Sequence, residues 1–164
     1  MPAYRSPGDC GRMSLYVWLR LLGCDVTVDD VNSRVEIGPN GSSIEQLHKV
    51  SEELQIRGVV RFVKPSELRR VRKPFILHGD AGIAAEHGFF TVIVAYDPLK
   101  GFAVVDPTNE FLGWFEEGRM ASQASGYVLA PRGSNYHEVA SIAGLVLSGS
   151  VFVWVLSGLR LPAG

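Results

Sequence analysis

The sequence predicts an α+β domain, with helices first and antiparallel strands later, followed by one C-terminal transmembrane helix. Three observations support this. Helical periodicity is confined to the first third of the chain, short apolar runs separated by turn residues follow, and residues 139–159 carry no charge. We expect a domain over residues 1–131, a linker over 132–138 and a membrane helix over 139–159.

Two amphipathic helices are expected near the N-terminus. Residues 11–22 repeat apolar side chains at helical spacing, and Gly23 follows at the position where a left-handed residue ends a helix. Residues 43–55 form the second helix, because Ser43 and Gln46 have the spacing of a capping box. The apolar face of the first helix consists of Leu15, Trp18, Leu19 and Leu22.

Five short strands follow, and a helical turn is expected over residues 65–71, after the first of them. Pro98 and Gly101 separate the third and fourth strands and predict a hairpin between them. The predicted strands are residues 58–63, 74–78, 87–96, 102–106 and 126–130.

The segment 139–159 contains 21 uncharged residues, of which 14 are apolar. As a helix it would rise about 31 Å, the thickness of the hydrocarbon core of a bilayer. The alternative is a pair of buried strands. A membrane anchor would make the protein single-pass, with its folded domain in the cytoplasm, because the N-terminus has no apolar core of a secretory signal.

The composition excludes several classes of protein. The 164 residues are 46% hydrophobic and 20% charged, which argues against disorder, and the formal net charge of −1 gives no bulk attraction to nucleic acid. Cys10 and Cys24 are too few for a disulfide scaffold or a cysteine zinc site. We therefore expect no metal, no cofactor and no nucleic acid partner.

Cys10 lies where the first helix begins. The positive end of the helix dipole lowers the pKa of a thiol there and makes it a better nucleophile. Cys24 lies beyond the C-terminal end of the same helix and is expected to be a small buried residue. The alternative for Cys10 is the same structural role.

A cysteine nucleophile needs a base, and His87 is the strongest candidate because it opens the most strand-like segment of the chain. His78 is a second choice, while His48 is expected to be solvated and His137 borders the anchor. Asp106 ends the strand that pairs with the His87 strand, so its carboxylate could orient the imidazole.

The order of these groups resembles that of papain-like cysteine peptidases. More narrowly, it is similar to the bacteriocin-processing peptidases, which remove leader peptides after a double glycine. The resemblance covers about residues 8–130. It rests on Asp9-Cys10-Gly11, Leu21-Leu22-Gly23, Gly41-Ser42-Ser43, Lys73-Pro74-Phe75-Ile76-Leu77-His78, His87-Gly88-Phe89-Phe90, Val105-Asp106-Pro107 and Gly126-Tyr127-Val128-Leu129.

The resemblance implies that Cys10 is the nucleophile, His87 the general base and acid, and Asp106 the orienting residue. The family also uses a Gln six residues before the cysteine to bind the oxyanion, and this chain has Tyr4 there. The partners implied are a peptide or protein substrate, such as a leader peptide, and a separate transporter, because the sequence has no ATP-binding P-loop motif.

Two other functions fit the same sequence. The missing Gln would suit a module on this fold that binds a peptide or partner with little or no turnover, and a cysteine-dependent acyl transferase or amidase would use the same three groups. Residues 57–73 carry seven basic side chains against one acidic side chain. This run could dock on an anionic membrane, although a solvated surface is the simpler interpretation.

Overall fold

The computed structural model describes residues 10–39, 41–80 and 88–132. All of them belong to the first of two compact units, Met1–Arg132; the second unit, Gly133–Gly164, lies outside the described residues. The elements in chain order are α1 (Cys10–Leu21), α2 (Val28–Asn32), α3 (Ile44–Glu53), β1 (Gly58–Phe62), the 3₁₀ helix η2 (Pro65–Arg70), β2 (Phe75–Gly79), β3 (Phe89–Asp97), β4 (Gly101–Asp106), β5 (Phe111–Phe115), α4 (Glu117–Gln123) and β6 (Ala124–Pro131).

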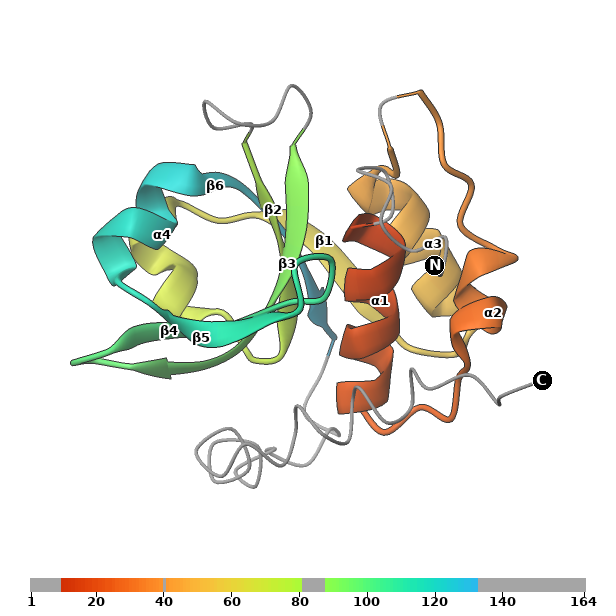
Figure 1. The fold of residues 1–164 in the computed structure, drawn as a ribbon, viewed down its shortest axis with the longest axis horizontal. Helices are drawn as coiled ribbons and strands as arrows, with labels where there is room; N and C mark the ends of the chain where they lie inside the picture. Colours follow the sequence, from red (N-terminus) through yellow and green to blue (C-terminus); the bar gives the residue numbers. More distant parts are fainter. Residues whose placement is uncertain (1–9, 40, 81–87, 133–164) are drawn as a thin grey trace. The chain divides into compact units, whose positions relative to one another are not determined.

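The strands form a six-stranded antiparallel sheet in the order β1-β6-β2-β3-β4-β5 (Figure 1). Strands β2 to β5 follow one another as a meander, whereas β6 returns to lie between β1 and β2. The expected α+β class, with helices first and an antiparallel sheet later, is therefore confirmed.

Both predicted helix boundaries have the expected local chemistry. Ser43 caps α3, with its hydroxyl accepting from the Gln46 N–H and the Gln46 side chain accepting from the Ser43 N–H. Gly23 follows α1 with a φ of +85°, a conformation that glycine adopts without steric cost.

One face of the sheet is covered by η2 and α4, and it holds a cluster of buried side chains. Side chains that alternate along a strand point to the same face, so cross-strand neighbours such as Phe75 and Ile93 meet there. The cluster comprises Leu68, Val71, Phe75, Leu77, Ile93, Phe102, Val104, Met120, Val128 and Ala130.

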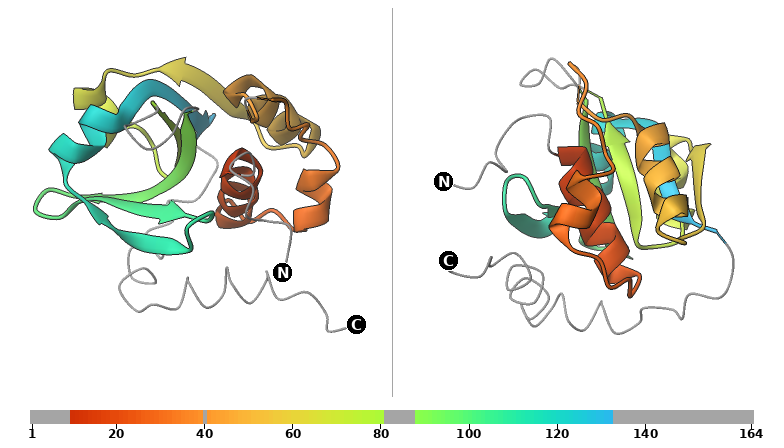
Figure 2. Two further views of the ribbon diagram at one scale, coloured as in Figure 1. Left: turned by 45° about the horizontal axis from the view of Figure 1, so that its top comes forward. Right: turned by 90° about the vertical axis from the view of Figure 1, so that its right-hand side faces the viewer.

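The opposite face packs against α1. Figure 2 shows α1 between the sheet on one side and α2 and α3 on the other. Trp18 is fully buried there, and its indole N–H donates a 2.9 Å hydrogen bond to the carbonyl oxygen of Pro74 at the start of β2. Both apolar packing and a buried polar contact therefore fix α1 on the sheet.

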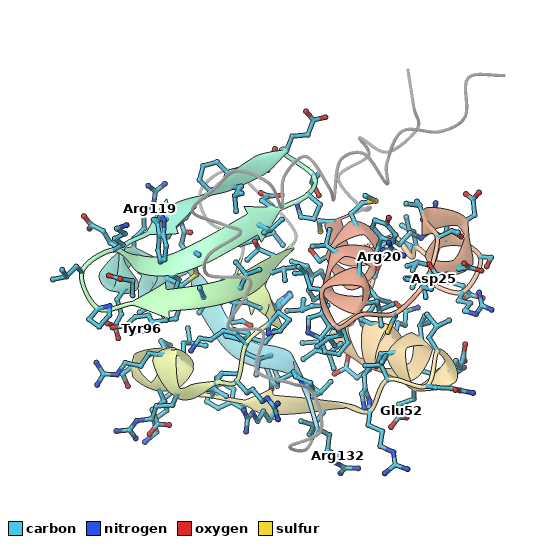
Figure 3. All side chains as sticks on the ribbon, turned by 90° about the horizontal axis from the view of Figure 1, so that it is seen from below. Arg20, Asp25, Glu52, Tyr96, Arg119 and Arg132 are labelled. Atoms are coloured by element: carbon cyan, nitrogen blue, oxygen red, sulfur yellow. The ribbon has the colours of Figure 1, made fainter. Side chains whose placement is uncertain are left out.

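Three described elements were not predicted. Helix α2 has only five residues, and a capping box between Thr27 and Asp30 defines it. In the sequence, strand β5 shows only a group of aromatic residues, Phe111, Trp114 and Phe115, without the alternation typical of a strand. Helix α4 buries a single residue, Met120. Tertiary contacts hold α4 instead, because Tyr96 donates to the Glu117 carboxylate at 2.7 Å and Arg119 stacks over Phe115 (Figure 3).

Within residues 10–39, 41–80 and 88–132, no helix has the length and hydrophobicity to cross a membrane. The predicted transmembrane helix, residues 139–159, lies outside the described residues, as does the linker after Arg132.

Replacing Trp18 with Phe should lower the free energy of unfolding by about 2 kcal/mol, because the buried carbonyl of Pro74 would lose its donor. Chemical denaturation measures the effect. Leu99→Ala is the control, since Leu99 is 97% exposed and should change stability by less than about 0.5 kcal/mol. A Trp18→Phe effect as small as that of the control would contradict this account.

Candidate active site

Cys10 is the first residue of α1, and the next residue fixes how closely α1 approaches its neighbours. A Cβ on Gly11 would lie 3.0 Å from Ser42 and 3.3 Å from the ring of Phe90 on β3. The Ser42 hydroxyl is buried and has no hydrogen-bond partner among the described residues. Glycine is therefore needed at position 11, and its absent side chain lets the start of α1 lie directly against β3.

Burial raises the pKa of the Cys10 thiol above its ordinary value. Backbone hydrogen bonds from Phe90 and Gly11 lower the pKa, as expected at a helix N-terminus, but loss of solvation outweighs them. The negative charge of Asp106 raises the pKa further. The lowering effect of the helix N-terminus that we expect at Cys10 is present but smaller than the effect of burial, so a nearby cation would be needed to stabilise the thiolate.

Asp106 ends β4 and is held by the turn that follows it. One carboxylate oxygen accepts from the backbone N–H groups of Thr108 and Asn109, at 3.0 and 3.2 Å, and the other accepts from the Asn109 side-chain amide at 2.7 Å. The fold thus brings Asp106 and Cys10, 96 positions apart in the sequence, within electrostatic range.

Asp97 lies in the turn at the opposite end of the β3–β4 hairpin from Asp106. Its carboxylate accepts from the N–H groups of Leu99 and Lys100. The predicted hairpin is confirmed, and Asp97 stabilises its turn.

Two predicted site residues, His87 and Tyr4, lie outside the described residues. The nearest described neighbour of His87 is Gly88, one residue before β3 begins at Phe89. The structure thus places Cys10 and Asp106 within electrostatic range of each other, and the catalytic roles of Cys10, Asp106, His87 and Tyr4 stay predictions.

His78 on β2 has a fixed orientation. Ser125 donates its hydroxyl proton to the His78 carbonyl oxygen at 2.9 Å, so its oxygen accepts from the imidazole Nδ1–H at 2.8 Å. Nε2 is then the unprotonated nitrogen. Burial lowers the pKa of His78, which favours this neutral form.

The His78 ring lies between Gly88 and Phe90, the β3 residue next to Cys10. Its centroid lies 5.0 Å from that of Phe90, whose backbone contacts Cys10. A Cβ on Gly88 would lie 2.4 Å from His78 Nε2 and 2.8 Å from the Gly79 carbonyl oxygen. His78 thus explains why glycine follows His87 in this chain.

His48 differs from its expected solvated state, because its Nε2 lies 3.2 Å from the carbonyl oxygen of Gly58 and connects α3 to β1. His137 lies outside the described residues. In the described part of the chain, no group of three or more His, Cys, Asp or Glu side chains could hold a metal ion.

A family profile described as the Peptidase C39 family matches residues 4–135 of this chain. No curated protein matches significantly.

Several solved structures share the fold. A double glycine motif protease from an AMS/PCAT transporter, in complex with its leader peptide, is 19% identical with a TM-score of 0.64, over 75% of this chain and 84% of that chain. The peptidase domain of Streptococcus ComA, a bi-functional ABC transporter, is 17% identical with a TM-score of 0.64, over 77% and 94%. The peptidase C39 like domain of a Vibrio parahaemolyticus toxin secretion protein is 12% identical with a TM-score of 0.61, over 77% and 100%.

Asp106→Asn should lower the pKa of Cys10, because it removes a negative charge that disfavours the thiolate while keeping an oxygen for the turn N–H groups. The rate of iodoacetamide alkylation against pH measures this pKa. The variant should be made in a background that carries Cys24→Ala and His87→Ala. The first change leaves Cys10 as the single thiol, and the second removes its predicted base. Asp97→Asn is the control. If Asp106→Asn leaves the alkylation profile unmoved, the electrostatic link between Asp106 and Cys10 is absent.

Gly88→Ala should destabilise the protein by about 1–3 kcal/mol, because the new methyl group overlaps the His78 ring. Gly118→Ala in α4 is the matched control. Nothing lies within 4 Å of its Cβ position, so it should be neutral or stabilising by up to about 1 kcal/mol. Denaturation with and without His78→Ala completes the test, since removing the ring should recover part of the loss. Equal effects of the two glycine changes would refute the packing argument.

Proposed function

Because this chain belongs to the peptidase C39 family, we propose that it is a cysteine peptidase that hydrolyses an extended peptide with Cys10 as its nucleophile. One observation carries the proposal: a thiol at the start of α1 lies against β3, within electrostatic range of the carboxylate that ends β4. The fold shared with solved peptidase domains supports it.

In the proposed reaction, protonated His87 pairs with the Cys10 thiolate and offsets its cost of burial. The thiolate attacks the peptide carbonyl carbon, and the resulting tetrahedral intermediate collapses as His87 gives its proton to the leaving amine. This leaves a thioester on Cys10. His87 then takes a proton from water as the water attacks the thioester. Collapse of this second tetrahedral intermediate releases the acid product and regenerates the Cys10 thiolate paired with protonated His87.

Asp106 has the capacity to orient His87. A carboxylate offers about four lone-pair sites, and the turn uses three of them. The remaining site could accept the Nδ1 proton of His87. Asp106 would then fix both its own turn and the tautomer of the imidazole.

The oxyanion of the intermediate needs donors as well. The backbone N–H of Cys10 at the helix N-terminus is one candidate, and the Tyr4 hydroxyl is the other. Loss of one oxyanion donor typically costs about 10²–10³ in rate, so replacement of the family's Gln by Tyr4 bears directly on turnover.

We further propose a leader peptide as the substrate and a membrane as the location. A relative of known structure is a double glycine motif protease with a bound leader peptide, and another is the peptidase domain of an ABC transporter. The uncharged segment 139–159 would hold this domain at the membrane, with the domain in the cytoplasm beside a separate transporter.

A second candidate function is a peptide-binding module of low activity. The raised pKa of Cys10 favours it, as does the absence of Gln before Cys10. Such a module would bind the peptide at the same site without needing a thiolate.

Cys10→Ala should lower the cleavage of synthetic peptides with a double glycine site by at least about 10³-fold, because the nucleophile is lost. Mass spectrometry of the products measures this, and Cys24→Ala should keep the wild-type rate. Cleavage that survives Cys10→Ala would rule out the proposed peptidase. Peptide binding by wild-type protein that never cleaves would favour the binding module instead.

A further inference from the structure

The basic run over residues 57–73 does not act as one surface. Arg69 pairs with Glu117 at 3.7 Å, and Arg70 pairs with Glu67 at 3.8 Å. Lys73 donates to the carbonyl oxygen of Arg69 and is half-buried, which lowers its pKa. These three cations contribute to the packing of η2, so the structure separates them from the cations of β1.

Of the other four cations in the run, Arg72 is half-buried, while Arg57, Arg61 and Lys64 lie with Arg132 at one margin of the sheet. Strand β1 ends the strand order and pairs only with β6, so no other described strand lies along its outer edge. Near the start of β1, His48 contacts the Gly58 carbonyl oxygen. Four exposed cationic side chains lie along this outer edge, and we call them the cationic edge: Arg57, Arg61, Lys64 and Arg132.

Backbone contacts hold these four residues near one another. Arg57 and Arg61 are four residues apart along an extended segment, so their side chains share a face. Arg132 donates its N–H to the carbonyl oxygen of Arg57 at 2.7 Å, and Figure 3 shows its side chain beside β1. Lys64 directly follows Val63, whose N–H bonds to Gly126 on β6 at 2.7 Å.

Within the described residues, none of the four forms an ion pair. At the end of α3, Glu53 lies 4.0 Å from Lys49, and Glu52 lies 3.5 Å from His48, which counts as neutral in the formal net charge of −1. A cluster of four exposed cations that have no ion-pair partner among the described residues would attract an anionic surface.

The position of Arg132 indicates which anionic surface this is. The uncharged segment 139–159 begins seven residues after Arg132, and seven extended residues span at most about 25 Å. If that segment enters a bilayer, as proposed above, the chain length alone keeps Arg132 within this distance of the point of entry. Cations near an anionic membrane are each attracted to it, and salt weakens the attraction.

We propose that the cationic edge docks on an anionic lipid surface and sets the orientation of the peptidase domain at the membrane. This inference rests on the membrane location proposed above and extends it to four named side chains. Charged residues on a free strand edge also prevent pairing with other chains, which gives a competing explanation. An acidic peptide substrate is a second competitor for the same charges.

The test is a lipid titration of the full chain with phosphatidylcholine vesicles, with or without phosphatidylglycerol, at low and high salt. The test variant changes Arg57, Arg61, Lys64 and Arg132 to Gln. The matched control changes four exposed cations elsewhere, Arg34, Arg70, Lys100 and Arg119, to Gln, so both variants have the same net charge. Cleavage of a soluble peptide without lipid is measured in parallel.

Wild type should partition more strongly into vesicles with phosphatidylglycerol, and high salt should remove the difference. Each surface cation is worth about fivefold in partitioning, so the test variant should lose at least about 100-fold of this preference while the control keeps most of it. Insertion of the apolar segment alone would depend little on the anionic lipid, so this preference reports the cationic edge.

Two results would overturn the proposal. Equal partitioning of the test and control variants would leave the cationic edge as protection against strand pairing. A raised KM for soluble peptide in the test variant, with its lipid preference intact, would assign the charges to the substrate. Failure of wild type to cleave any peptide would count against the peptidase and not against lipid docking, because partitioning is measured separately.

Discussion

The packing of α1 against the sheet is the constraint on which the rest of the structure depends. Trp18 anchors the middle of the helix by filling space and by donating to the Pro74 carbonyl oxygen. Gly11 lets its first turn approach β3 to within contact of Phe90. A helix held at both points cannot slide or rotate without opening the core, so the thiol of Cys10 has a defined position relative to β3 and β4.

The position of Cys10 also makes its thiolate form less favourable. The burial that fixes Cys10 also removes solvent from its thiolate, and the Asp106 carboxylate disfavours the thiolate further. An imidazolium placed between the Cys10 thiolate and the Asp106 carboxylate would be stabilised by both negative charges. Burial and the Asp106 charge thus give a physical reason for a third, cationic member of the site.

Local signals in the sequence predicted the elements whose chemistry lies within a few residues. The Ser43–Gln46 capping box and the left-handed Gly23 mark real helix ends, and the Pro98–Gly101 turn marks a real hairpin. Helix α4 and strand β5 were missed because contacts from other elements hold them. His48 was misplaced for the same reason, since its partner is a carbonyl group on β1.

The sequence by itself determined the α+β class, the cysteine at the start of a helix and the candidate partners Asp106 and His87. Each of these depends on periodicity, turn chemistry or residue type. The tertiary structure alone decided that β6 lies between β1 and β2, that His78 is locked against Ser125, and that four of the cations share one edge of the sheet. It also decided that burial outweighs the helix dipole at Cys10, because solvation depends on every neighbour of an atom and not only on those nearby in the chain.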